Sequence, residues 1–234
     1  MIKFNLHTHT IYSDGKNTPE EMINRAIELN FSDLGFSEHA DDVCSEDGIV
    51  MLQKDYIKYF NLLDTLKEKY KSQINIYKGL ELDAFSYTPK VKLDYTIGSI
   101  HYIKKNNEFY SIDFDAETSR KIVDIFGGTK NLLIAYLEEM IAFAKRNPYN
   151  ILAHFDLYTK FNEIDPIFDV NSKEYLDMAT NALEEVINLG KIIEINTGAI
   201  SRGYRTTFYP SLSLVKVLND LKAPIILGSD AHSK

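Results

Sequence analysis

Short apolar runs alternate along the chain with longer amphipathic segments. Seven runs are nearly continuous in apolar residues, which is typical of strands covered on both faces. They lie at 2–7, 33–39, 74–83, 94–103, 150–156, 191–197 and 223–232. Segments with apolar residues every three to four positions predict helices at 19–29, 53–71, 129–147, 172–190 and 211–222. This alternation predicts an α/β fold with a parallel sheet, and seven repeats favour a barrel over an open sheet.

Two of these helices carry terminal signals. Thr18 is the expected N-cap of the first helix, Pro19 takes its first position, and Glu21 completes a capping box. Gly190 is the expected C-cap of the helix over 172–190. In the helix over 53–71, an apolar face is expected to point inward: Tyr56, Tyr59, Phe60, Leu63 and Leu66.

Length and composition fit one globular domain over residues 1–234. The chain has 6 prolines and 11 glycines, and they form no linker-like tract. A formal net charge of −8 repels a phosphate backbone, so we expect no nucleic-acid partner. The only cysteine, Cys44, falls in a polar loop through Gly48, and a lone thiol suggests a reducing compartment. With no signal peptide and no apolar stretch of about 20 residues, we expect a cytoplasmic protein without a membrane partner.

The histidines share one position relative to the predicted strands. All six fall at or just beyond the carboxyl end of a strand, and Glu81 and Asp230 occupy equivalent places. Parallel strands deliver their carboxyl ends to one rim, where the sites of α/β proteins are built. The histidines are His7, His9, His39, His101, His154 and His232.

Such a ring predicts a metal centre. His7 and His9 are two residues apart in an extended segment, so their imidazoles point the same way. Imidazole and carboxylate ligands without thiolate suit zinc, manganese or iron, and the set does not choose among them. Six histidines and several carboxylates exceed the need of one tetrahedral ion, so we expect more than one ion. Clustered ions of this kind are typical of phosphatases.

The motifs resemble the polymerase and histidinol phosphatase (PHP) superfamily, and within it the monofunctional histidinol-phosphate phosphatases. The resemblance runs from residue 4 to the end and rests on these segments: HTHTIYSDG at 7–15, SEHA at 37–40, GLELD at 79–83, IGSIHYI at 97–103, AHFDL at 153–157, EINTGAISRG at 194–203 and LGSDAH at 227–232.

The resemblance implies a distorted seven-stranded (β/α)7 barrel that holds two to three divalent ions. His7, His9, Glu81 and Asp230 are expected to hold one ion, and Glu81 to bridge to a second one. That second ion is expected on His101 and His154, and a third on His39 and His232.

Two features depart from the family pattern. Many relatives place another histidine shortly after the H-x-H pair, where this chain has Asp14 followed by Gly15. Asp14 is either a substitute ligand of the third ion or a turn residue. Relatives also usually continue into a further helix and strand after the last motif. Without them, the outer face of the last strand is expected to lack its cover.

Arg202 follows the sixth strand and is expected to clamp two phosphate oxygens. Tyr204 and Arg205 are weaker candidates for the same site. Tyr102 and Tyr158 either line a substrate pocket or pack in the core.

The resemblance implies hydrolysis of L-histidinol phosphate to L-histidinol and phosphate, the penultimate stage of histidine biosynthesis. We expect a metal-activated hydroxide as nucleophile, with catalytic roles for Asp230, His232 and Arg202. No serine or cysteine nucleophile motif is evident. The alternatives are a PHP phosphoesterase for another small ester, such as a nucleotide or sugar phosphate, and a metal-binding module without turnover.

Overall fold

The computed structural model describes residues 3–40, 49–87 and 89–234. The chain forms two compact units, of which unit 1 comprises Met1–Ile97 and Gly228–Lys234, and unit 2 comprises Gly98–Leu227. The chain passes from unit 1 to unit 2 within strand β4 and returns at the end of strand β9. The predicted loop through Cys44 and Gly48 lies outside the described residues.

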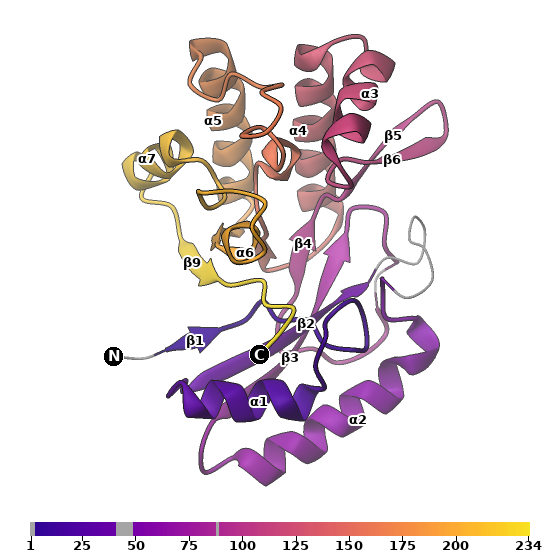
Figure 1. The fold of residues 1–234 in the computed structure, drawn as a ribbon, viewed down its shortest axis with the longest axis vertical. Helices are drawn as coiled ribbons and strands as arrows, with labels where there is room; N and C mark the ends of the chain where they lie inside the picture. Colours follow the sequence, from indigo (N-terminus) through magenta and orange to yellow (C-terminus); the bar gives the residue numbers. More distant parts are fainter. Residues whose placement is uncertain (1–2, 41–48, 88) are drawn as a thin grey trace. The chain divides into compact units, whose positions relative to one another are not determined.

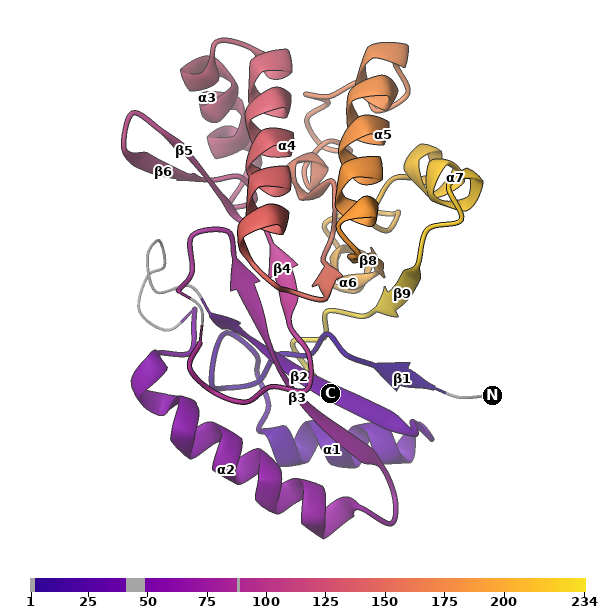
Figure 2. The same cartoon turned by 180° about the vertical axis from the view of Figure 1, so that it is seen from behind.

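Unit 1 is built on a parallel sheet in the order β1-β2-β3. Helices α1 and α2 pack along these strands, as Figures 1 and 2 both show. The β2–β3 pairing is long and regular, and it places His39 directly opposite Glu81. The elements are β1 (Phe4–Asn5), α1 (Pro19–Glu28), β2 (Asp33–Ala40), α2 (Gln53–Tyr70) and β3 (Asn75–Asp83).

Unit 2 contains strands in the order β4-β7-β8-β9 and a separate β5–β6 hairpin. Helices α4 and α5 lie side by side in both views (Figures 1 and 2). The strands are β4 (Ile97–Ser99), β5 (Tyr102–Lys105), β6 (Glu108–Ser111), β7 (Ile151–Leu152), β8 (Ile192–Asn196) and β9 (Ile225–Gly228). The helices are α3 (Ala116–Phe126), α4 (Thr129–Arg146), a short 3-10 turn (Leu157–Thr159), α5 (Lys173–Asn188), α6 (Gly198–Ser201) and α7 (Leu212–Asp220).

The predicted start of α1 and the buried face of α2 are confirmed. Thr18 caps α1 in extended conformation, Pro19 occupies the first position, and Thr18 and Glu21 make the reciprocal bonds of a capping box. All five residues of the predicted inner face of α2 are buried. The capping box fixes where α1 begins, and thus the length of the loop between His9 and this helix.

Two glycines make room for Tyr95 in unit 1. A Cβ on Gly35 of β2 or on Gly79 of β3 would overlap the Tyr95 ring. The Tyr95 hydroxyl donates to the carbonyl oxygens of Leu6 and Phe36, the latter at 3.1 Å. Tyr95 therefore connects the segment before the H-x-H pair to β2.

The predicted strand over 94–103 is wrong in its second half. The parallel strand is limited to Ile97–Ser99, and Tyr102 starts the β5–β6 hairpin. Asn106 and Asn107 form the turn with positive φ values of 51° and 66°, a conformation that asparagine tolerates well. Helix α3 was not predicted, and α5 ends with Leu189 as its C-cap, one residue before Gly190.

Strand β9 has an apolar exposed side. Ile225 is 54% and Leu227 59% exposed, in line with the expectation for the last strand. None of the described helices combines the length and apolar character needed to cross a bilayer.

Candidate metal centre

The backbone of unit 1 brings the first and last motifs together. Thr8 and Ala231 form a parallel β-bridge. The His9 amide donates to the Ala231 carbonyl at 2.9 Å, and the Ala231 amide donates to the His7 carbonyl at 3.1 Å. His7 and His9 therefore lie beside Asp230 and His232, although more than 220 residues separate them in sequence.

Strand β2 places His39 beside the segment that carries His7 and His9, on the side opposite the last motif. The Ser37 amide donates to the Thr8 carbonyl at 3.0 Å, and the Thr8 amide donates to Ser37 Oγ at 3.0 Å. Because His39 is opposite Glu81 in the register, the sheet delivers both to one point, with 2.8 Å between His39 Nδ1 and Glu81 Oε2.

The side chains converge as the sequence predicts. Glu81 Oε2 lies 3.4 Å from His7 Nε2 and 3.5 Å from His9 Nε2. Asp230 Oδ1 lies 3.5 Å from His7 Nε2 and 3.3 Å from His9 Nε2. The His9 ring stacks on His39 and on His232, with centroid distances of 4.2 and 4.3 Å. Unit 1 thus gathers all the ligands predicted from its own residues.

Asp14 lies with the histidines rather than only in a turn. Its carboxylate oxygens are 3.1 Å from His232 Nε2 and 3.6 Å from His39 Nε2. The ligand atoms of His9, Asp14, His39 and His232 all lie within 4.8 Å of one another, as do those of His7, His9 and Asp230. Unit 1 therefore offers two groups of side chains that can hold an ion.

These spacings fit metal coordination. Nitrogen and oxygen ligands about 2.1 Å from a tetrahedral ion lie ~3.4 Å apart, the edge of the tetrahedron. The distances from Glu81 and Asp230 to the Nε2 atoms of His7 and His9 range from 3.3 to 3.5 Å. His9 Nε2 is buried, and among the described residues it has no hydrogen-bond partner. Buried nitrogen without a partner is costly, and a bound cation removes that cost.

The electrostatics keep His9 neutral and Asp14 ionised. Burial, together with the nearby imidazoles of His39 and His232, lowers the pKa of His9 from 6.5 to about 3 against the opposing effects of Asp230 and Glu81. Burial alone raises the pKa of Asp14, but the hydrogen bond with His232 and the charges of His39 and His9 bring it well below its usual value. Neutral imidazole and ionised carboxylate are the forms that bind metals.

Unit 2 contributes a second histidine pair. The ring centroids of His101 and His154 are 5.1 Å apart. Ser99 Oγ lies 3.2 Å from His101 Nδ1, and the His154 amide donates to buried Glu194 at 3.2 Å. Both histidines follow the ends of their strands, β4 and β7, as predicted.

Two of the predicted ligands, Asp230 and His154, have an unusual backbone conformation. Asp230 has φ 48° and His154 has φ 21°, values that residues other than glycine seldom adopt. Such strained residues cluster at functional sites, where the surrounding structure holds them in place. Asp230 lies two residues after the end of β9, and His154 lies two residues after the end of β7.

The arginines differ in their surroundings. Arg202 is the C-cap of α6 and is exposed. Arg205 is buried, and its Nη1 donates to Thr159 Oγ1 at 2.7 Å while its guanidinium stacks on Tyr209. Arg205 therefore holds the loop after α6 in place.

The tyrosines are explained mainly by packing. Tyr158 is buried against Tyr136 and Phe168, and its hydroxyl contacts that of Tyr175 at 2.8 Å. Tyr204 is 41% exposed and lies over Lys160, with 4.6 Å from the ammonium to the ring centroid. Tyr102 is the first residue of β5 and is partly exposed.

Sequence reasoning missed three charged residues near the histidines. Glu38 is completely buried beside His39, and Lys160 forms a 3.0 Å ion pair with Asp113. Burial alone raises the pKa of Asp113, but the Lys160 ammonium and the imidazoles of His101 and His154 bring it below its usual value. The S-I-D run at 111–113 carries no motif, so only the fold reveals this carboxylate.

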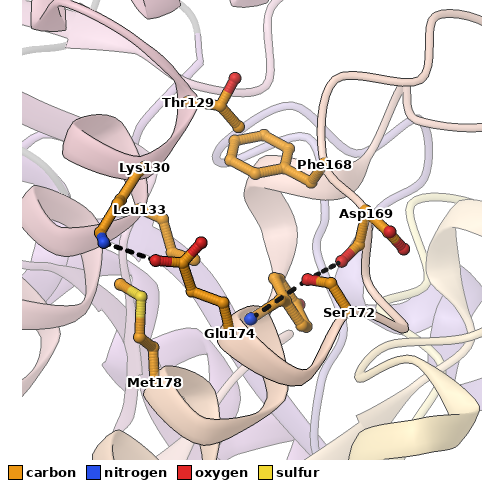
Figure 3. A pocket seen from close by; sticks show the side chains of 9 residues that line it. Thr129, Lys130, Leu133, Phe168, Asp169, Ser172, Glu174 and Met178 are labelled. Atoms are coloured by element: carbon orange, nitrogen blue, oxygen red, sulfur yellow. Dashed lines mark hydrogen bonds and ion pairs between the residues drawn. The ribbon is translucent and has the colours of Figure 1, made fainter.

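A cavity of about 190 Å³ in unit 2 is lined by none of the predicted metal ligands. Its wall includes Leu133, Phe168 and Met178, and an ion pair between Lys130 and Glu174 crosses it (Figure 3). It contains no histidine and is smaller than the usual ligand pocket of about 300–1,000 Å³. The chemistry of the chain therefore points to the histidine clusters.

A family model described as the PHP domain matches residues 5–198, most of the chain. The chain belongs to the PHP domain family. A solved structure of a putative histidinol phosphatase from Listeria monocytogenes is similar to this PHP chain with a TM-score of 0.87 and 26% identity, covering 99% of this chain and 96% of that one. This likeness confirms the predicted α/β fold class of the PHP barrel type.

Two further relatives of this PHP protein extend the comparison. A probable histidinol-phosphatase from Schizosaccharomyces pombe is 29% identical over 250 residues, covering 97% of this chain and 79% of the relative. A histidinol phosphate phosphatase from Lactococcus lactis, solved in complex with zinc, L-histidinol and phosphate, has a TM-score of 0.69 and 21% identity. That match covers 99% of this chain and 86% of the other.

Proposed function

We propose that this PHP protein is a cytoplasmic, metal-dependent phosphomonoesterase that hydrolyses L-histidinol phosphate to L-histidinol and phosphate in histidine biosynthesis. The observation that carries the proposal is the convergence of His7, His9, Glu81 and Asp230 at the spacing of metal ligands. Its family membership and the names of its relatives, histidinol-phosphatase in each case, support the substrate.

The proposed metal centre holds two to three zinc, manganese or iron ions. Its proposed ligands are His7, His9, Asp14, His39, Glu81, His101, His154, Asp230 and His232. The two overlapping ligand groups of unit 1 support more than one ion there. The His101–His154 pair of unit 2 supports another. Zinc in the Lactococcus lactis structure supports zinc as one of the metals.

Residues 1–234 are proposed to act as a single PHP domain, with ligands from both units serving the same substrate. The family model supports this, because its match runs continuously across the unit boundary at Ile97. Mutations in either unit are then expected to affect the same reaction.

The chemistry proposed is direct transfer of the phosphoryl group to water. Divalent ions supply positive charge to the phosphoryl oxygens and make water a stronger nucleophile at neutral pH. Arg202 binds two phosphate oxygens through its guanidinium and stabilises the charge that develops on them. Asp230 would take a proton from the attacking water and pass it to the ester oxygen as its bond to phosphorus breaks, or a water held by the ions would supply that proton. His232 is oriented by the 2.9 Å contact of its Nδ1 with the Asp230 carbonyl oxygen.

A panel of phosphate esters tests the proposal. Metal-loaded protein is assayed for phosphate release from L-histidinol phosphate, adenosine monophosphate, a hexose phosphate and p-nitrophenyl phosphate. We expect kcat/KM for L-histidinol phosphate to exceed the others by at least about tenfold, since recognition of polar groups discriminates strongly. Preference for another ester would identify a different PHP phosphoesterase, and inactivity of loaded protein would indicate a binding module.

Arg202→Ala is expected to lower kcat/KM for L-histidinol phosphate about a hundredfold, the usual effect of losing one donor to developing charge. Arg202→Lys should recover only part of the loss, because an ammonium lacks the two-pronged geometry of guanidinium. Arg120→Ala is the matched control, since Arg120 is an exposed arginine of unit 2 that pairs with Asp165. If Arg202→Ala stayed within twofold of wild type, Arg202 would have no role in phosphate binding.

A further inference from the structure

Glu38 is a buried carboxylate next to a proposed metal ligand. It precedes His39 on β2, and because side chains alternate along a strand, the two point to opposite faces of the sheet. Glu38 is 0% exposed and reaches Tyr59 on the buried face of α2. An ionised carboxylate in such a place is costly unless hydrogen bonds compensate for the lost water.

Four donors surround the Glu38 carboxylate. Oε1 accepts from Thr10 Oγ1 and from the Tyr59 hydroxyl, each at 2.6 Å. Oε2 accepts from the Thr10 amide at 2.9 Å and from Ser13 Oγ at 2.5 Å. Three of the four donors belong to the segment 10–13, which follows the H-x-H pair directly. Glu38 thus ties this segment to β2.

The segment 10–13, held by its hydrogen bonds to Glu38, determines where Asp14 lies. Ser13 is held by Glu38 on one side of Asp14, and the Gly15 amide donates to the Thr10 carbonyl at 2.9 Å on the other. A Cβ on Gly15 would overlap the His9 and Thr10 backbone, so the turn is tight. Asp14 is fixed between these two points, with its carboxylate 3.1 Å from His232 Nε2 and 3.6 Å from His39 Nε2.

We propose that Glu38 is a positioning residue for the ion held by His9, Asp14, His39 and His232. By fixing the segment 10–13 it places the Asp14 carboxylate, and without it that one ion is lost while the others remain. This inference rests on the proposed metal centre of the phosphatase. Its test reads metal content, so it is separate from the question of which ester is hydrolysed.

Glu38→Gln is the main variant, because glutamine keeps the shape but turns an NH2 group toward donors that need an acceptor. Wild type, Glu38→Gln, Asp14→Ala and the double variant are loaded with Zn²⁺, desalted and analysed for zinc per chain. Each single variant should lose about one ion per chain. The double variant should lose no more than either single one, because both act on the same ion.

Two tyrosine variants on α2 separate positioning from general stability. Tyr59→Phe removes the hydroxyl of α2 that donates to Glu38 and leaves the three bonds to the segment 10–13. It should lower the melting temperature but keep all the zinc. Tyr70→Phe is the matched control, since its hydroxyl contacts Glu20 instead.

Ser13→Ala covers the case in which Glu38→Gln does not fold. It removes one hydrogen bond between Glu38 and the segment 10–13. It should raise the Zn²⁺ concentration that fills the last site by about tenfold, the lower end of the effects seen when residues that support metal ligands are replaced. Circular dichroism verifies folding of every variant. The inference is overturned if folded Glu38→Gln retains all its zinc or loses every ion. It is also overturned if Ser13→Ala and Tyr59→Phe need the same Zn²⁺ concentration to fill the last site.

Discussion

Glu81→Gln is expected to lower kcat for L-histidinol phosphate by more than about a hundredfold and to release bound metal. Substitutions outside the ligand shell already cost about 10–100-fold, and Glu81 is proposed as a ligand itself. Its Oε2 atom lies 2.8 Å from His39 Nδ1 and within 3.5 Å of the Nε2 atoms of His7 and His9. A neutral amide at this point removes the negative charge that the cations require.

The measurement combines metal content with steady-state kinetics on the same preparation. Glu20→Gln serves as the matched control, because Glu20 is a glutamate of unit 1 that pairs with Lys69 at the surface. It should keep both metal and activity. Full metal content and wild-type kcat in Glu81→Gln would show that Glu81 is not part of the centre.

His101→Ala and His154→Ala are each expected to reduce kcat by a factor similar to that of Glu81→Gln and to remove about one ion per chain. The two imidazoles form a pair in unit 2, with centroids 5.1 Å apart, and neither substitution changes a residue of unit 1. A loss of activity from either one therefore means that unit 2 ligands take part in the same reaction. The His101→Ala/His154→Ala double variant should lose no more metal than each single variant, because both residues are assigned to one ion.

Lys104→Ala, on β5 three residues after His101, is the control for local disturbance of unit 2. It should leave metal content and kcat near wild type. If His101→Ala and His154→Ala kept both metal and turnover, the centre would be confined to unit 1, and the single-domain proposal would lose its basis.

The sequence predicted that the proposed ligands of unit 1 converge, because two simple rules apply to them. Parallel strands end at one rim, and polar residues placed there have few other reasons to be buried. His39 and Glu81 illustrate this, since the register of β2 and β3 sets them opposite each other. The bridge between Thr8 and Ala231 adds what periodicity does not show, namely that the first and last motifs are neighbours.

The hairpin after His101 was missed because its apolar pattern continues that of β4. Apolar residues recur along the segment 94–103 as far as Ile103, so the apolar pattern does not mark the change from a parallel strand to an antiparallel hairpin. The signal lies further on, in Asn106 and Asn107, two residues that accept positive φ between two short strands.

Glu38 was missed for a different reason. In the sequence Glu38 stands between Ser37 and His39, and on an alternating strand it faces away from the proposed metal ligands. Its donors come from two separate places, the segment 10–13 and α2. Such a contact depends on tertiary structure, which the pattern of a single segment does not encode.

Elemental analysis of the wild-type protein, purified without chelators, tests the central claim most directly. If the dispersed histidines and carboxylates form one metal centre, the analysis should find two to three zinc, manganese or iron ions per chain, and their removal should abolish phosphate release until metal is restored. A protein that takes up less than one such ion per chain after loading would contradict the account.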